Sequence, residues 1–154
     1  MIVEDGTGLD NADSFVSVAY ADTYFSDRNI TAWTTLTNKE ALLIQATDYI
    51  EAVYSQAWKG TTLNDTQSLS FPRIINDETV YPDRLKKAVC ELALKADSGS
   101  LLEDTEQRTI EESVGSITVK YAEYANQKTQ YSFVYNLVSP YLLSSGASAR
   151  LIRC

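Results

Sequence analysis

One stretch in the first half of the chain constrains the fold more than any other feature. From Leu42 to Val53, apolar side chains recur every three or four residues, while polar residues such as Asp48 occupy other positions on the same turns. That spacing predicts an amphipathic helix about five turns long. Just before it, Thr37 and Glu40 form a capping box, in which each side chain binds a free amide at the helix start. We therefore expect a helix that begins after Thr37 and buries one face.

Further segments carry weaker helical signals. Ser17 is a candidate N-cap for a first helix that fades near residues 27–29. Pro82 suits the first turn of another helix, which Ser98 and Gly99 end. A last helix over 131–143 contains Pro140, which should kink or divide it because proline removes a backbone hydrogen bond.

The remaining segments complete the expected architecture. Residues 55–81 read as a long irregular loop, and the alternation within 106–122 predicts a β-hairpin. The expected fold class is mainly α: a small bundle of three to four helices, with a long central loop and a β-hairpin before the last helix. Residues 1–144 would form a single helical domain, and 145–154 a flexible C-terminal tail.

The charge of the chain indicates which partners it can bind. The 154 residues include 21 acidic and 13 basic side chains and no histidine, which gives a net charge of −8. Binding to a phosphate backbone normally needs a lysine- and arginine-rich face, and Lys86-Lys87 is the densest basic pair. The composition therefore disfavours nucleic-acid binding, and an acidic wall would instead let DNA slide past. No apolar stretch reaches the roughly 20 residues of a membrane span, and the N-terminus lacks signal-peptide bases, so we expect no membrane partner.

Residues suited to catalysis or metal binding are scarce. Without histidine, the usual general base and the serine and cysteine triads are missing. The turn at 5–8 has glycines but no Walker lysine, and Glu4, Asp10 and Asp13 do not have the spacing of a calcium loop. Cys90 falls within an apolar helical pattern and is expected to be a buried small hydrophobe. We nominate no catalytic, cofactor-binding or metal-binding residue and expect no enzyme activity.

The ten tyrosines favour packing or interfaces. Some lie on or beside the apolar stripes and others cluster in the last third: Tyr20, Tyr24, Tyr49 and Tyr54 in the first group, Tyr121, Tyr124, Tyr131 and Tyr135 in the second. Tyrosine is enriched in protein interfaces and can also stack on bases. Since stacking platforms normally sit in basic grooves, the sequence favours core or interface roles.

Several blocks of the chain, taken together, resemble a known family over nearly the full length. They are Ile2-Val3-Glu4-Asp5-Gly6-Thr7-Gly8 with Ser14-Phe15 and Ala21-Asp22-Tyr24-Phe25, Lys39 to Ile50, Trp58-Lys59-Gly60, Leu69-Ser70-Phe71-Pro72-Arg73, Ala88-Cys90-Glu91-Leu92-Ala93-Leu94, and Arg150-Leu151-Ile152-Arg153. The family is encoded in the head-assembly region of tailed phages and prophages. Its members are often labelled DnaT-like single-stranded-DNA-binding proteins and resemble head–tail adaptor (connector, head completion) proteins.

This resemblance implies a structural virion protein at the neck of the particle, made in the host cytoplasm. It would be a homo-oligomeric ring, commonly of twelve copies, between a portal protein and a tail or stopper protein. Double-stranded DNA would pass through the lumen without specific binding. A ring subunit meets its neighbours through two different faces, and the candidate interface residues are Trp58, Phe71, Arg73, Ile117, Val119 and Tyr121.

The C-terminal tail has its own hypothesis. Arg150, Leu151, Ile152 and Arg153 are locally basic and apolar, so we expect them to dock on the portal and to order on binding. Two alternatives stay open. One is a DnaT-like single-stranded-DNA-binding protein with salt-sensitive affinity, and the other is a small enzyme with unusual carboxylate chemistry.

Overall fold

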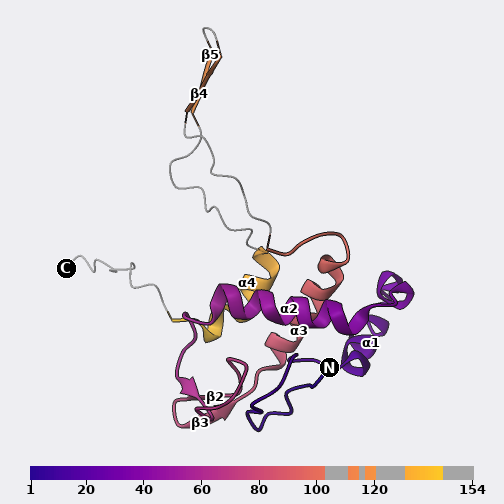
Figure 1. Cartoon of the computed structure of the whole chain (residues 1–154), viewed down its shortest axis with the longest axis vertical. Helices are drawn as coiled ribbons and strands as arrows, with labels where there is room; N and C mark the ends of the chain where they lie inside the picture. Colours follow the sequence, from indigo (N-terminus) through magenta and orange to yellow (C-terminus); the bar gives the residue numbers. More distant parts are fainter. Residues whose placement is uncertain (103–110, 115–116, 121–130, 144–154) are drawn as a thin grey trace, which may run out of the picture.

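The computed structural model describes residues 1–102, the strands at 111–114 and 117–120, and residues 131–143 (Figure 1). These ranges hold four α-helices, two short 3-10 helices and two antiparallel sheets. The helices are α1 (Val18–Ser26), η1 (Thr31–Thr35), α2 (Lys39–Tyr54), α3 (Asp83–Ala96), α4 (Ser132–Val138) and η2 (Ser139–Tyr141). The strands are β1 (Thr61–Thr62), β2 (Arg73–Ile75), β3 (Glu78–Val80), β4 (Glu111–Val114) and β5 (Ile117–Lys120).

The helices enclose the hydrophobic core. α2 packs along α3, α3 packs against α4, and α1 touches both α2 and α3. Figure 1 shows α2 running across the body, with β2 and β3 below it in the view. The largest fully buried side chains come from the helices, the N-terminal segment and the loop after α2: Trp33, Tyr49, Phe15, Phe25, Phe71, Leu42, Leu43, Ile50, Leu85 and Leu92.

The expected fold class is wrong, because the loop predicted over 55–81 contains a sheet. β1, β2 and β3 form a three-stranded antiparallel sheet in that order, so the fold is mixed α/β. The turn between β2 and β3 is made by Asn76 and Asp77, whose φ angles are +52° and +65°. Two consecutive residues with positive φ match the right-handed twist of a tight hairpin, and asparagine and aspartate tolerate that conformation.

Several element predictions are confirmed. Ser17 caps α1, since its hydroxyl accepts the amide of Tyr20 at 3.2 Å. β4 and β5 pair as a hairpin in which Glu111 faces Lys120 along the backbone register. The last helix ends at Val138, and Pro140 lies in the 3-10 turn that follows.

The capping box is the exception among the helix signals. α2 begins at Lys39, and its N-cap is Asn38, whose side chain makes no capping hydrogen bond. Thr37 therefore lies one residue too early to serve as the cap. Within the described ranges, none of the helices combines the length and the apolar character that crossing a membrane requires.

The N-terminal loop is held by a buried acid. Glu4 is 3% exposed, and its carboxylate accepts the amides of Gly6, Gly8 and Leu9 at 2.8–2.9 Å. The glycine-containing turn thus folds around a side chain of the same loop. No group of three or more metal-ligating side chains gathers in the described part of the chain.

Candidate functional site

The positive charges of the described residues are unevenly distributed. Ranges 1–102 and 131–143 contain eight lysines and arginines, and four of them lie just after α1 or on the first turns of α3: Arg28, Arg84, Lys86 and Lys87. Three tyrosines lie among them: Tyr20, Tyr24 and Tyr81. We call these seven residues the α1/α3 face.

Most of the other cations are engaged within the protein. Arg73 is 9% exposed and donates to the carbonyls of Lys59, Ser70 and Gly60. Lys39 pairs with Asp22 at 2.8 Å, and Lys59 donates to the carbonyl of Pro140. Lys95 is exposed near the far end of α3, where its ammonium lies 5.6 Å from the ring centre of Tyr131. The α1/α3 face therefore holds half of these eight cations, of which Lys87 is itself paired with Asp83.

Hydrogen bonds between α1 and α3 hold the two tyrosines of α1. The hydroxyl of Tyr20 donates to Asp83 at 2.6 Å, and that of Tyr24 donates to Glu91 at 2.8 Å. The spacing from Tyr20 to Tyr24 places both rings on the same side of the helix. Because each hydroxyl is bound to a carboxylate on α3, the rings have restricted orientations. Burial, together with these bonds, raises the pKa of both phenols well above the ordinary value, so both stay neutral.

A third tyrosine precedes α3. The hydroxyl of Tyr81 donates to the carbonyl of Phe15 at 2.7 Å, and burial raises the pKa of this phenol. The ammonium of Lys86 lies 4.3 Å from the ring centre of Tyr81 and 5.9 Å from that of Tyr20. Lys86 thus sits between two aromatic rings while remaining half-buried.

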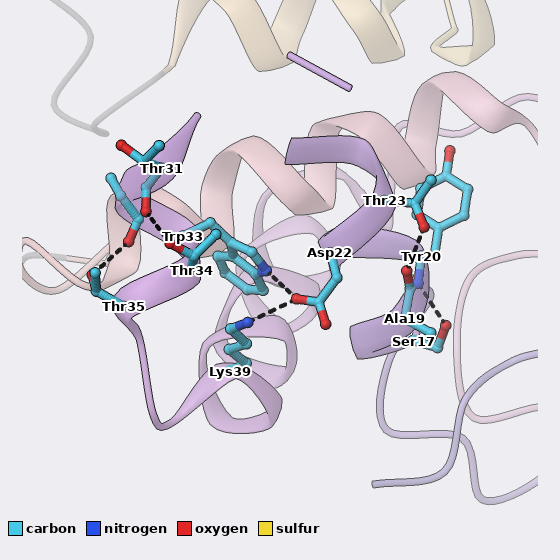
Figure 2. Close-up of polar contacts among 11 residues, drawn as sticks. Ser17, Ala19, Tyr20, Asp22, Thr23, Thr31, Trp33, Thr34, Thr35 and Lys39 are labelled. Atoms are coloured by element: carbon cyan, nitrogen blue, oxygen red, sulfur yellow. Dashed lines mark hydrogen bonds and ion pairs between the residues drawn. The ribbon is translucent and has the colours of Figure 1, made fainter. Parts of the chain in front are cut away.

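Arg28 covers the opposite end of this surface. Its guanidinium carbon lies 3.7 Å from the ring centre of Tyr24, and its Nη1 donates to the Tyr24 carbonyl at 2.9 Å. Beside it is a surface hollow of about 270 Å³, lined by Tyr20, Thr23, Tyr24, Asp27, Arg28 and Lys87. Tyr20 and Thr23 come from successive turns of α1 and point to one side of the helix (Figure 2).

Acidic side chains partly neutralise the positive charge of the α1/α3 face. Lys87 pairs with Asp83 at 2.8 Å, and the hydrogen bond from Lys87 lowers the pKa of that carboxyl. Arg84, three residues before Lys87 and on the same side of the helix, is exposed. Cations beside aromatic rings occur in surfaces that bind nucleic-acid strands, where bases stack and phosphates meet positive charge. Of the three rings of this face, Tyr20 and Tyr81 are half-buried and Tyr24 is buried beneath Arg28.

The residues predicted as subunit contacts lie elsewhere. Trp58 and Phe71 are 4% and 0% exposed and pack edge to face, with ring centres 4.9 Å apart, while Arg73 ties the backbone around them. The three residues are neighbours, and they lie in the interior of the protein. Ile117 and Val119 lie on β5, of which the structure describes only the backbone.

Other expected positions lie outside the described residues. These are Tyr121 and the tail residues Arg150, Leu151, Ile152 and Arg153. Cys90 is fully buried and unpaired, as expected from its place in an apolar stripe.

The sequence alone carries only part of the signal for the α1/α3 face. Lys86-Lys87 is the densest basic pair, and Tyr20 and Tyr24 lie on or beside an apolar stripe, which is typical of the edge of a core. Nothing local shows that residues 20–28 and 81–87 meet. Only the packing of α1 against α3 makes the neighbourhood of these tyrosines basic.

The fold and the face together define a small acidic α/β domain with one localised basic and aromatic surface. The family described as "Putative DnaT-like ssDNA binding protein" matches residues 1–154, and the chain belongs to this family. No curated protein and no solved structure matches the chain.

This match corrects the expectations drawn from the phage resemblance. The family is described by single-stranded-DNA binding and not as a family of head–tail adaptors, so the expected virion connector and the ring between portal and tail are overturned. The expected partners are corrected likewise: the family points to single-stranded DNA and not to double-stranded DNA passing through a lumen. A net charge of −8 averages over the whole surface and does not show that four cations lie on the α1/α3 face.

Proposed function

We propose that this protein binds single-stranded DNA through the α1/α3 face. The observation that carries the proposal is that Arg28, Lys86 and Lys87 meet Tyr20, Tyr24 and Tyr81 on an otherwise acidic chain, with exposed Arg84 on the same first turns of α3. The family description supports the same function. The role is non-enzymatic, in keeping with a sequence that contains no histidine.

The cations of the α1/α3 face differ in exposure, and therefore in how they can contact a phosphate. Arg84 is exposed near the start of α3 and can meet a phosphate directly. Lys86 and Lys87 are half-buried, each held near a partner, so they present charge at defined positions. Backbone contacts of this kind do not depend on base sequence, and counterion release makes the affinity fall as salt rises.

The acidic remainder of the chain sets the strength and the position of binding. With a net charge of −8, the protein repels a phosphate backbone outside the basic face. We therefore expect modest affinity, with a Kd of about 1–100 µM near physiological salt, as for sequence-independent binders. Restricting DNA to one face also predicts that a few substitutions abolish binding.

The test is fluorescence anisotropy with a labelled oligonucleotide of about 15 nucleotides, within the span that one small domain covers. Wild type should bind, and the slope of log affinity against log salt should indicate about three phosphate contacts. The triple variant Arg84→Ala/Lys86→Ala/Lys87→Ala should bind at least about tenfold more weakly because it loses those contacts. Circular dichroism checks that each variant is folded.

The matched control removes the same number of charges elsewhere: Lys39→Ala/Lys59→Ala/Lys95→Ala. It should keep most of the affinity. Equal losses in the two triple variants would show that only net charge matters and would refute the assignment to the α1/α3 face. No binding by wild type at low salt would refute the function.

A further inference from the structure

The hollow beside Arg28 has the size of a subsite for a small group. Its volume of about 270 Å³ is bounded by α1, the residues that follow it, and Lys87 of α3. Pockets for drug-sized ligands span roughly 300–1,000 Å³, so this hollow suits a fragment of that size or smaller, such as a single base.

One wall of the hollow is a flat cation. The Arg28 guanidinium lies against the Tyr24 ring at 3.7 Å, and Nη1 is anchored on the Tyr24 carbonyl. Tyr24 is itself held by the bond from its hydroxyl to Glu91. Arg28 is exposed, so the guanidinium plane turned away from Tyr24 is open for stacking. Bases stack on arginine planes as they do on aromatic rings.

The polar groups of the hollow differ in whether they are already engaged. Thr23 donates its hydroxyl to the Ala19 carbonyl, Tyr20 donates to Asp83, and Lys87 pairs with Asp83. Asp27, the C-cap residue of α1, is exposed, and its carboxylate has no hydrogen-bond or ion-pair partner among the described residues. An ionised carboxylate only accepts hydrogen bonds. Asp27 is therefore the acceptor of the hollow that is free to read a ligand, while the remaining N–H groups of Arg28 are the free donors.

We propose that the hollow holds one unpaired base stacked on Arg28, and that Asp27 selects bases carrying an exocyclic amino group over thymine. This inference rests on the proposed function and adds base preference to it. Cytosine, adenine and guanine each offer a carboxylate an exocyclic amino donor, whereas the donor of thymine is its ring N3–H, which lies between two carbonyl oxygens. A carboxylate that accepts from this N3–H therefore also faces two oxygens that it repels. Lys87, on the opposite element, is placed to meet the adjoining phosphate.

The experiment compares oligothymidine with oligocytidine of equal length, about 15 nucleotides, by anisotropy near neutral pH. Wild type should bind oligocytidine roughly fivefold more tightly, the effect of one charge-assisted hydrogen bond that is partly exposed to water. In Asp27→Asn the ratio should fall to about one, because an amide can donate as well as accept. Affinity for both strands should rise in that variant, since a negative charge near phosphates is removed.

The control is Asp65→Asn, which removes the same charge from an exposed loop position. It should leave the ratio as in wild type. The base ratio is the informative readout, because a purely electrostatic effect of Asp27 would change both affinities and leave their ratio unaltered. Equal affinity of wild type for the two strands, or an unchanged ratio in Asp27→Asn, would overturn the inference. Failure of wild type to bind either strand would overturn the proposed function as well.

Discussion

The guanidinium of Arg28 lies 3.7 Å from the centre of the Tyr24 ring, four residues earlier in the chain. Arginine and tyrosine side chains often pair in this way, because the ring face carries partial negative charge. In this protein the pair faces a hollow on the basic surface, and the bond from Tyr24 to Glu91 ties it to α3. The pair is thus a preformed platform and not a free surface charge.

The platform predicts that Arg28→Lys weakens binding although the charge is kept. Lysine lacks the plane that stacks on a base, and stacking contributes about 1–3 kcal/mol per base. We expect the affinity for single-stranded DNA to drop roughly fivefold in Arg28→Lys and somewhat further in Arg28→Ala. Anisotropy titrations measure both. Lys95→Ala, at the other end of α3, is the control and should change affinity little; wild-type affinity in Arg28→Lys would contradict stacking.

Asp22 joins α1 to the start of α2. Its Oδ1 accepts the indole N–H of buried Trp33 at 2.7 Å and the ammonium of Lys39 at 2.8 Å (Figure 2). The hydrogen bond from Lys39, together with that from Trp33, lowers the pKa of this carboxyl below its ordinary 3.8. A carboxyl with a lowered folded-state pKa stabilises the protein above the unfolded value, and this contribution is lost as pH falls through the folded value.

Asp22→Asn should therefore reduce stability near neutral pH and reduce its loss in acid. The carboxylate is half-exposed and the ion pair is screened, so we expect a cost of about 0.5–1 kcal/mol at pH 7. Below pH 3.8 the difference between variant and wild type should shrink. Urea unfolding at a series of pH values tests this, with Asp10→Asn as an exposed control. A difference that stays constant down to the most acid pH would contradict the prediction.

Gly60 allows the sheet to close on the loop after Trp58. Its φ is +70°, and an added Cβ would lie 2.0 Å from the carbonyl oxygen of Ile74 in β2. Since that atom belongs to the backbone, no side-chain movement relieves the clash. Gly60→Ala should destabilise the fold by at least about 2 kcal/mol, the range seen for strained backbone positions. Urea unfolding measures it, with Thr61→Ala at the adjacent exposed strand residue as the control; equal stability of the two variants would contradict the reason given.

The thiol of Cys90 should be unreactive toward thiol reagents in the folded protein. It is fully buried on α3, and burial raises the pKa of its thiol to about 12. The thiolate is the reactive form, and at pH 8 almost none is present. In a Cys154→Ser chain, Ellman's reagent should therefore react only after unfolding in urea. Rapid stoichiometric reaction of the native chain at pH 8 would show that the α3 core opens more readily than its packing indicates.

Local chemistry predicted the helices well because their signals lie within a few residues. Ser17 caps α1, the stripe from Leu42 to Val53 becomes α2, and Pro140 divides the final helical segment. The sheet in 61–80 was predictable in part: the β-branched residues of 73–75 and 79–80 flank Asn76-Asp77, which is a hairpin signal. β1 was not predictable, since two residues carry no pattern and pair with β2 only through tertiary packing.

The amino-acid sequence by itself determined where most helices form, that Cys90 is buried, and which residues could carry charge and aromatic surface. Each of these depends on hydrophobic period, capping or side-chain type. Tertiary structure decided which charges meet. In the folded chain Arg73 is buried against the loop at 59–60, and Lys39 is paired with Asp22. The cations of α3 lie beside the tyrosines of α1. Electrostatic potential depends on distances between groups far apart in sequence, so a net charge of −8 could not reveal a basic face.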